Sequence, residues 1–135
     1  MNLNSLGLME SIIKILFVDD DDDLRDIVRT EVMSSSGHRV VEAFDCDSAM
    51  RLLQSEKFDL VLLDITLPDK SGMEILKHIQ EKHLSTRVIM VTGTVGLEKA
   101  IMSTTLGAQD YITKPFTLNY LLRSIEHVLS IEHTR

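Results

Sequence analysis

The amino-acid sequence predicts an α/β fold, a doubly wound five-stranded parallel sheet with five helices. Short apolar runs rich in β-branched residues alternate along the 135 residues with segments whose apolar residues recur at helical spacing. The connections are short, and no repeat, low-complexity stretch or proline-rich linker interrupts the alternation. Such an alternation is typical of a parallel sheet with helices on both faces, and the length is close to the commonest size for one domain.

The first strand and the first helix follow a short amino-terminal segment. Residues 12–18 (IIKILFV) form an apolar, β-branched run that predicts a strand. Apolar residues then recur at helical spacing as far as Gly37, a residue typical of a helix carboxyl-terminal cap. At the other end of this helix, Asp22 or Asp23 is expected to be the amino-terminal cap.

The next three elements lead to the middle of the sheet. Residues 39–43 predict the second strand, and residues 47–56 predict a short helix that starts near Asp45 or Asp47. Residues 60–63 (LVLL) are apolar at every position, which is typical of a parallel strand covered on both faces.

The second half of the chain continues the alternation after a loop over residues 66–72. Helical spacing of apolar residues predicts the helices, and short β-branched runs predict the strands. These elements are a helix around residues 73–79, a strand over 88–91, a helix over 97–106 that Gly107 ends, a strand over 111–113 and an amphipathic helix over 118–129.

Composition and charge restrict the function classes. The net charge of −7, from 21 acidic against 14 basic residues, argues against direct nucleic-acid binding, which favours a basic face. Cys46 is the single cysteine, so an intramolecular disulfide is excluded and a reducing compartment is expected. No apolar run approaches the roughly 20 residues that span a membrane, and the sequence before Lys14 lacks the basic start of a secretory leader. We expect a cytoplasmic protein without a membrane partner, with a loosely ordered extension over residues 1–11 and one domain over residues 12–135.

Polar side chains follow four of the five predicted strands. They are Asp19 and Asp20 after the first strand, Asp64 after the third, Thr92 after the fourth and Lys114 after the fifth. Each alone is what a helix cap, a turn or a solvated side chain would provide, but sites in open α/β sheets form at the carboxyl ends of the strands, where all five should meet. Crowded carboxylates need a cation, and oxygen ligands without His or Cys select a hard ion such as Mg²⁺. With a lysine and a hydroxyl beside it, such a site suits phosphoryl transfer onto an aspartate.

Four segments together resemble the receiver domains of bacterial response regulators. They are FVDDDDDLR at 17–25, LLDITLPDKSG at 62–72, VTG at 91–93 and YITKPF at 111–116. The resemblance covers about residues 12–131 and implies the flavodoxin-like strand order 2-1-3-4-5. It also implies a phosphoacceptor that catalyses only its own phosphorylation and dephosphorylation, and not an enzyme with a separate substrate.

The resemblance implies a role for each residue of the acidic site. Asp64 corresponds to the phosphorylated aspartate, and Lys114 corresponds to the lysine that pairs with the phosphoryl oxygens. Asp19 and Asp20 correspond to the acidic pair that holds Mg²⁺, with Asp20 as a direct ligand and Asp19 acting largely through water. Asp64 and the backbone carbonyl of Thr66 complete the metal ligands, and Mn²⁺ is an alternative ion.

The resemblance also implies a conformational switch beside the phosphoacceptor. Thr92 corresponds to the switch hydroxyl that moves toward the phosphate, and Tyr111 corresponds to the switch aromatic whose rotamer changes with it. Gly93 corresponds to a small residue that gives access to the site.

Further family positions concern dephosphorylation and backbone geometry. Thr66 and Thr94 occupy the positions that tune self-dephosphorylation, and both are short enough to leave space for an attacking water. The peptide bond between Lys114 and Pro115 is expected to be cis.

Partners follow from the same resemblance. The phosphoryl donor would be a sensor histidine kinase or a histidine phosphotransfer protein. The signal would pass to a downstream effector protein or to an output domain outside this sequence. A phosphorylation-dependent homodimer through the fourth and fifth helices is a further expectation, although no single residue points to it.

Two other function classes are open from the residues. Asp19-x-Asp21 fits the nucleophile motif of haloacid-dehalogenase-like phosphatases, but the run from Asp21 to Asp23 lacks the Thr or Val of that motif, and the length leaves no room for a cap. Turnover of p-nitrophenyl phosphate would favour this class. The other class is a receiver-like interaction module that is never phosphorylated, which the complete Asp, Thr and Lys set argues against. Unchanged spectra on adding Mg²⁺ and beryllofluoride would favour it.

Overall fold

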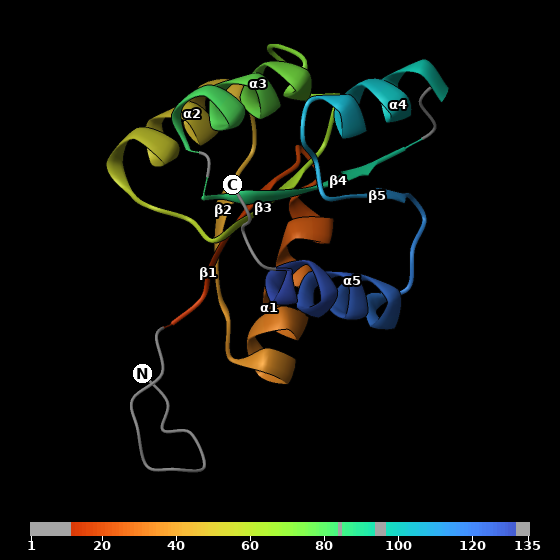
Figure 1. Ribbon diagram of the computed structural model, residues 1–135. Coiled ribbons are helices and arrows are strands. Elements are labelled where there is room, and N and C mark those ends of the chain that lie inside the picture. Colours follow the sequence, from red (N-terminus) through yellow and green to blue (C-terminus); the bar gives the residue numbers. More distant parts are fainter. Residues whose placement is uncertain (1–11, 84, 94–96, 132–135) are drawn as a thin grey trace.

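Five parallel strands form a sheet in the computed structural model, which describes residues 12–83, 85–93 and 97–131. The strand order is β2-β1-β3-β4-β5, so the predicted order is confirmed (Figure 1). The strands are β1 (Lys14–Val18), β2 (Arg39–Ala43), β3 (Leu60–Leu63), β4 (Arg87–Thr92) and β5 (Asp110–Thr113).

Helices cover both faces of the sheet, as the alternating pattern predicts. α1 (Asp22–Ser36) and α5 (Leu118–Ser130) lie on one face (Figure 1). The other face carries α2 (Cys46–Ser55), α3 (Gly72–Lys82) and α4 (Leu97–Thr105). Within the described ranges, no helix has the length and apolar character needed to span a membrane.

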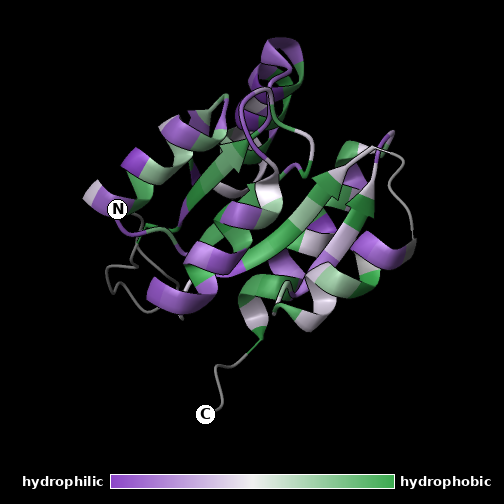
Figure 2. Cartoon of the chain, turned by 90° about the horizontal axis from the view of Figure 1, so that it is seen from above, coloured by the Kyte–Doolittle hydropathy of each residue, from purple (hydrophilic) through white to green (hydrophobic). Residues whose placement is uncertain are grey.

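Each face of the sheet has its own buried apolar cluster, and β3 contributes to both. Val61 and Leu63 pack with residues of α2 and α3, whereas Leu60 and Leu62 pack with residues of α1 and α5. All four residues are buried, which explains why this strand is apolar at every position. Figure 2 shows the hydrophobic colour concentrated on the strands and the hydrophilic colour on parts of the helices. Burial of each large side chain stabilises the fold by about 1.5–3 kcal/mol, so β3 is a firm base for the residue that follows it.

The amino-terminal cap of α1 is Asp21, so the prediction of Asp22 or Asp23 was wrong. Asp21 has extended backbone angles (φ −87°, ψ 103°), and its carboxylate accepts the N–H of Leu24 at 3.1 Å. Asp22 and Asp23 are already helical and lie in the first turn, where negative charge suits the helix dipole. Gly37 caps the other end with a φ of 78°, as predicted.

Other boundaries move by one or two residues. β1 begins at Lys14, Thr92 is the last residue of β4, and Cys46 opens α2 instead of preceding it. Asp45 caps α2, because its carboxylate accepts the N–H of Ser48 at 2.7 Å. In return, the Ser48 hydroxyl accepts the N–H of Asp45 at 3.3 Å, which completes a capping box. The extension expected over residues 1–11 lies outside the described residues.

Candidate functional site

Three carboxylates meet at the carboxyl edge of the sheet. β1 and β3 are neighbours with Val18 opposite Leu63, so the residues that follow them, Asp19 and Asp64, emerge side by side. Carboxylate oxygens of Asp19, Asp20 and Asp64 lie within 4.8 Å of one another. Asp19 and Asp64 are buried, whereas Asp20 is exposed. The structure therefore brings together the three acids that the strand ends predicted.

The ammonium group of Lys114 bridges the two buried carboxylates. Its Nζ donates to Oδ2 of Asp19 at 2.5 Å and to Oδ2 of Asp64 at 3.0 Å. The peptide bond between Lys114 and Pro115 is cis. Burial lowers the pKa of Lys114, but hydrogen bonds and charge interactions with Asp19 and Asp64 outweigh burial and hold the pKa above its usual value. The lysine therefore keeps its positive charge at this edge.

Burial dominates the electrostatics of Asp19. None of its surface is exposed, and the loss of water raises the pKa of its carboxyl group above the usual value. Lys114 and the backbone N–H of Asp21 oppose this rise, whereas the charge of Asp64 adds to it. The ionised form of Asp19 thus lacks sufficient positive charge around it, and a cation next to Asp20 would supply that charge.

Two further groups hold the carboxylate of Asp64. The buried hydroxyl of Thr92 donates to Oδ1 at 2.6 Å, and the backbone N–H of Thr66 donates to the same oxygen at 3.0 Å. One oxygen of Asp64 therefore faces a hydroxyl and an amide, and the other faces Lys114. Next to Thr92, a Cβ built on Gly93 would meet nothing within 4 Å, so this glycine leaves open space. The predicted tuning residue Thr94 lies outside the described residues.

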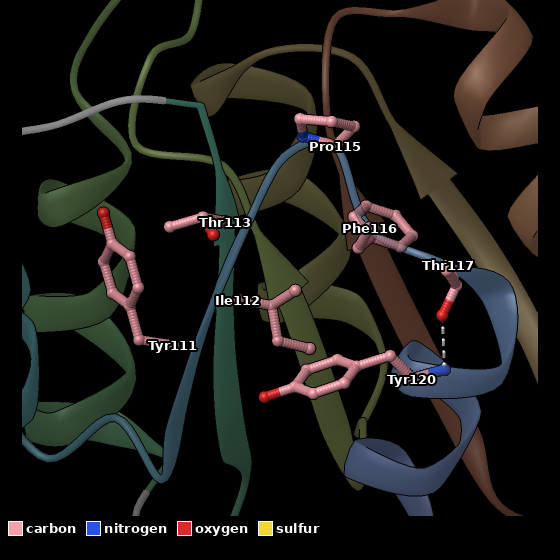
Figure 3. A pocket seen from close by; sticks show the side chains of 7 residues that line it. All are labelled: Tyr111, Ile112, Thr113, Pro115, Phe116, Thr117 and Tyr120. Atoms are coloured by element: carbon pink, nitrogen blue, oxygen red, sulfur yellow. Dashed lines mark hydrogen bonds between the residues drawn. The ribbon is translucent and has the colours of Figure 1, made fainter.

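The aromatic ring of Tyr111 is turned into the protein. Its hydroxyl is buried and has no hydrogen-bond partner within the part of the chain that the structure describes. Burial and the charge of Asp64 both raise the pKa of this hydroxyl. Tyr111 contributes to the lining of a cavity of about 300 Å³, and Figure 3 shows its ring on the other side of β5 from Ile112 and Tyr120. The lining residues are Tyr111, Ile112, Thr113, Pro115, Phe116, Thr117 and Tyr120. An unpaired buried hydroxyl costs about 1–3 kcal/mol, which opposes the inward position.

The donor set of this edge suits a hard divalent ion. Asp19, Asp20 and Asp64 offer only oxygen atoms, and this group contains no His or Cys. Mg²⁺ binds one or two carboxylates and keeps several of its waters. An exposed carboxylate, Asp20, beside the two buried ones leaves the ion open to water on one side, as this coordination requires. Thr66 lies in the loop that follows Asp64, and its side chain is exposed. The residues present therefore fit the expected ion.

Sequence reasoning missed Arg25, a buried arginine on α1 that supports the acidic edge. Only 8% of the residue is exposed, and its guanidinium donates to the backbone carbonyl of Asp19 and to the carboxylate of Asp22. Its Nε also donates to Glu42 at 3.1 Å. The available signal was a basic residue three positions after an acid at the start of a helix. Arg25 therefore ties the loop that carries Asp19 to α1 and to β2.

Sequence reasoning also missed Asp69, which fastens the loop after Asp64 to the start of α2. Its Oδ1 accepts the N–H of Cys46 at 2.9 Å, and its Oδ2 accepts the N–H of Asp47 at 3.1 Å. The N–H of Lys70 also donates to Oδ1 at 2.9 Å. The first amides of a helix have no partner within the helix, so one carboxylate satisfies two of them and fixes the loop that contains Thr66.

The contribution of Asp69 should depend on pH. Hydrogen bonds from the backbone of Cys46, Asp47 and Lys70 hold the pKa of Asp69 below its ordinary value of 3.8, although burial opposes them. Because the folded pKa lies below the unfolded pKa, the stabilisation is complete above the ordinary value and is lost as pH falls through the folded value. We expect the Asp69→Asn variant to have a lower free energy of unfolding than wild type at neutral pH. This difference in free energy should disappear in acid. Urea unfolding at a series of pH values measures this difference.

A matched control removes a different carboxylate from the same helix end. Asp47 is exposed and reaches Lys70 only at 3.7 Å, so Asp47→Asn should lose less stability than Asp69→Asn at neutral pH. An equal loss of stability in the two variants would show that the hydrogen bonds of Asp69 to the start of α2 make no specific contribution to stability.

Comparisons with known proteins agree on one family. The sequence profile of the response regulator receiver domain matches residues 15–126. The transcriptional regulatory protein CpxR of Escherichia coli K12 is 37% identical over 120 residues, which cover 89% of this chain and 50% of CpxR. The chain spans about half the length of the first curated relatives that it matches.

Solved structures share the fold over most of both chains. A CheY-like response regulator receiver domain from Methanospirillum hungatei JF-1 superimposes with a TM-score of 0.83 at 34% identity, covering 88% of this chain and 94% of that one. A BeF3-activated DrrB receiver domain has a TM-score of 0.79 at 33% identity, covering 90% of this chain and all (100%) of that one.

Proposed function

Because the chain belongs to the response regulator receiver domain family, we propose that it takes a phosphoryl group onto Asp64 in a Mg²⁺-dependent reaction. Receiver domains are signalling switches of two-component systems. Membership of this family argues against the alternative that the chain is a haloacid-dehalogenase-like phosphatase. The observation that carries the proposal is the convergence of Asp64, Lys114 and Thr92 on one point of the sheet edge.

The proposed reaction is an in-line attack by the Asp64 carboxylate. One carboxylate oxygen forms a bond to phosphorus while the phosphorus–nitrogen bond of a phosphohistidine breaks, and the imidazole leaves with the bonding electron pair. Lys114, which contacts Asp64 at 3.0 Å, is placed to neutralise charge on the phosphoryl oxygens. Asp19, Asp20, Asp64 and the carbonyl of Thr66 would hold Mg²⁺, which supplies further neutralisation of that charge.

The proposed output is a shift between two arrangements of Thr92 and Tyr111. The hydroxyl of Thr92 already reaches Asp64 at 2.6 Å, and the Tyr111 hydroxyl is buried without a partner among the described residues. Oxygens of a phosphoryl group on Asp64 would offer Thr92 stronger acceptors and so favour the inward arrangement. In this proposal both arrangements exist before modification, and the phosphoryl group shifts the balance between them.

The proposed partners lie on either side of the phosphoryl transfer. A sensor histidine kinase or a histidine phosphotransfer protein would be the donor in the cytoplasm. Curated relatives such as CpxR are transcriptional regulators twice as long as the match, so the receiver would act on an output domain or on a separate effector protein. α4, β5 and α5 would carry the signal, either to that partner or to a second copy of the chain. Ile101 and Met102 of α4 are exposed large apolar residues on this side.

Replacing Lys114 by alanine should separate ion binding from phosphoryl binding. Wild type is expected to bind beryllofluoride in the presence of Mg²⁺, since the related DrrB receiver domain has been solved in a BeF3-activated form. The Lys114→Ala variant should still bind Mg²⁺, because Asp19, Asp20 and Asp64 remain, but it should bind beryllofluoride at least about 100-fold more weakly, in line with the loss of a preorganised charge partner. Isothermal titration calorimetry with Mg²⁺ and then with beryllofluoride measures the two affinities separately.

Lys70→Ala is the matched control, because 62% of the Lys70 side chain is exposed and the residue lies in the loop that follows Asp64 without a contact to Asp64 among the described hydrogen bonds and ion pairs. It should behave as wild type in both titrations. Loss of Mg²⁺ binding with retention of beryllofluoride binding in Lys114→Ala would remove this lysine from the proposed role. A wild-type protein that responds to neither ligand would favour an interaction module without phosphorylation.

A further inference from the structure

Two histidine rings meet at the end of α3 that lies away from the Asp64 site. His78 lies in the second half of α3, and His83 is the carboxyl-terminal cap of this helix. Their Nε2 atoms are 3.3 Å apart, and both residues are half-buried. α3 starts at the carboxyl edge of the sheet and leads to the start of β4, so the pair lies at the opposite edge from the three carboxylates.

The backbone around His83 is fixed on both sides. The His83 N–H donates to the carbonyl of Ile79 at 2.7 Å, and the His83 carbonyl accepts the N–H of Thr86 at 2.9 Å. The buried hydroxyl of Thr86 donates in turn to the carbonyl of Phe58 at 2.8 Å. The backbone of His83 is therefore anchored to the turn before β4, so no backbone ordering is needed to hold this residue beside His78.

The geometry of the two rings matches that of a pair of metal ligands. An ion about 2.05 Å from two imidazole nitrogens at a tetrahedral angle places the nitrogens about 3.3 Å apart and the ring centroids about 5.2 Å apart. The observed separations are 3.3 Å for the nitrogens and 5.1 Å for the centroids, with the ring planes tilted by 55°. A straight hydrogen bond of the same length would place the centroids about 5.6 Å apart. The separations of the nitrogens and of the centroids are therefore close to those of two rings that share one ion.

We propose that Nε2 of His78 and Nε2 of His83 bind one divalent transition-metal ion of the Zn²⁺ type, with water in the remaining positions. Imidazole suits Zn²⁺, Ni²⁺ and Cu²⁺, whereas carboxylates suit Mg²⁺. The two edges of the sheet would thus select different ions. Among the described residues, Asp19, Asp20 and Asp64 form the only cluster of three or more possible ligand side chains. No third side-chain ligand from these residues therefore joins the histidine pair, and water would take the third position. The proposal is independent of phosphorylation at Asp64.

A Zn²⁺ titration of the full chain without an affinity tag tests the proposal. Excess Mg²⁺ occupies the carboxylate edge, and NMR follows the ring ¹H and ¹⁵N signals of the histidines. The signals of His78 and His83 should move together and saturate at one ion per chain. His38, whose Nε2 lies 2.7 Å from Glu126, and the exposed His127 should keep their signals.

Single substitutions then assign the ligands. His78→Ala and His83→Gln should each weaken Zn²⁺ binding at least about tenfold, because each removes one of two protein ligands. His127→Ala should bind as wild type does. Circular dichroism checks that each variant is folded, and the rise in melting temperature that Zn²⁺ gives wild type should be absent in the first two variants.

Three results would overturn the proposal. They are equal Zn²⁺ affinity in His78→Ala and wild type, movement of only one of the two ring signals, and saturation at one ion per two chains. The first two would identify the pair as a plain hydrogen bond. The third would indicate an ion shared between copies of the chain.

Discussion

The Asp64→Asn variant should take up no phosphoryl group from acetyl phosphate and should not bind beryllofluoride. Asparagine keeps the size of aspartate and retains an acceptor for Thr92 and for the N–H of Thr66, which donate to Oδ1 at 2.6 and 3.0 Å. Its amide nitrogen, however, replaces an oxygen of the nucleophile and can no longer accept from Lys114. Intact-protein mass spectrometry after incubation with acetyl phosphate and Mg²⁺ measures incorporation directly.

The control for this experiment is an acid near the site without a contact to Asp64. Asp23 is exposed in the first turn of α1, and Asp23→Asn should be labelled as wild type is. If Asp64→Asn retained Mg²⁺-dependent labelling, the phosphoacceptor would have to be another residue. Asp20 would be the first to test, because it is the exposed member of the acidic group.

The Gly72→Ala variant should be strongly destabilised and should lose much of its beryllofluoride affinity. A Cβ at this position would lie 1.9 Å from the backbone oxygen of Asp64 and 3.1 Å from Cα of Ile65. These are backbone atoms, so no side chain can rotate away to relieve the clash. The N–H of Gly72 also donates to the carbonyl of Ile65 at 2.7 Å, which fixes the start of α3 against the end of β3. We expect a loss of about 3 kcal/mol in the free energy of unfolding, measured by urea unfolding.

Gly93→Ala is the matched control for Gly72→Ala. A Cβ on Gly93 meets nothing within 4 Å, and Gly93 is not among the positive-φ glycines. Its stability should change by less than about 1 kcal/mol, with a small gain expected from the stiffer unfolded chain. A Gly72→Ala variant as stable as Gly93→Ala would contradict the close approach of α3 to Asp64.

The arrangement of the sheet and of its polar edge was predictable because each depends on a local pattern. A run such as Leu60–Leu63 is apolar at every position only when both faces are covered, which indicates a central parallel strand. Once the strands are placed, the carboxyl ends of parallel strands must share one edge. Asp19, Asp64 and Lys114 were therefore brought together by topology alone, before any contact was known.

The contacts that support this edge were not predictable, because they join residues whose partners are set by packing. The carboxylate of Asp69 reaches the N–H of Cys46 across 23 positions of sequence. Arg25 reaches Glu42 across 17 positions. No spacing rule connects such pairs. The cap of α1 was misplaced for a different reason, because five consecutive aspartates offer identical side chains and only the backbone angles of Asp21 distinguish it.

The sharing of one ammonium group between two carboxylates has a consequence for the order of binding. When ionised, the three acids of this edge outnumber Lys114 by three charges to one. A phosphorylated donor is itself negative, so it would be repelled by the bare edge and admitted once a divalent ion has brought the local charge to zero. We therefore expect the ion to bind before the phosphorylated donor. The apparent affinity of the donor should then rise with Mg²⁺ concentration until the ion site is saturated.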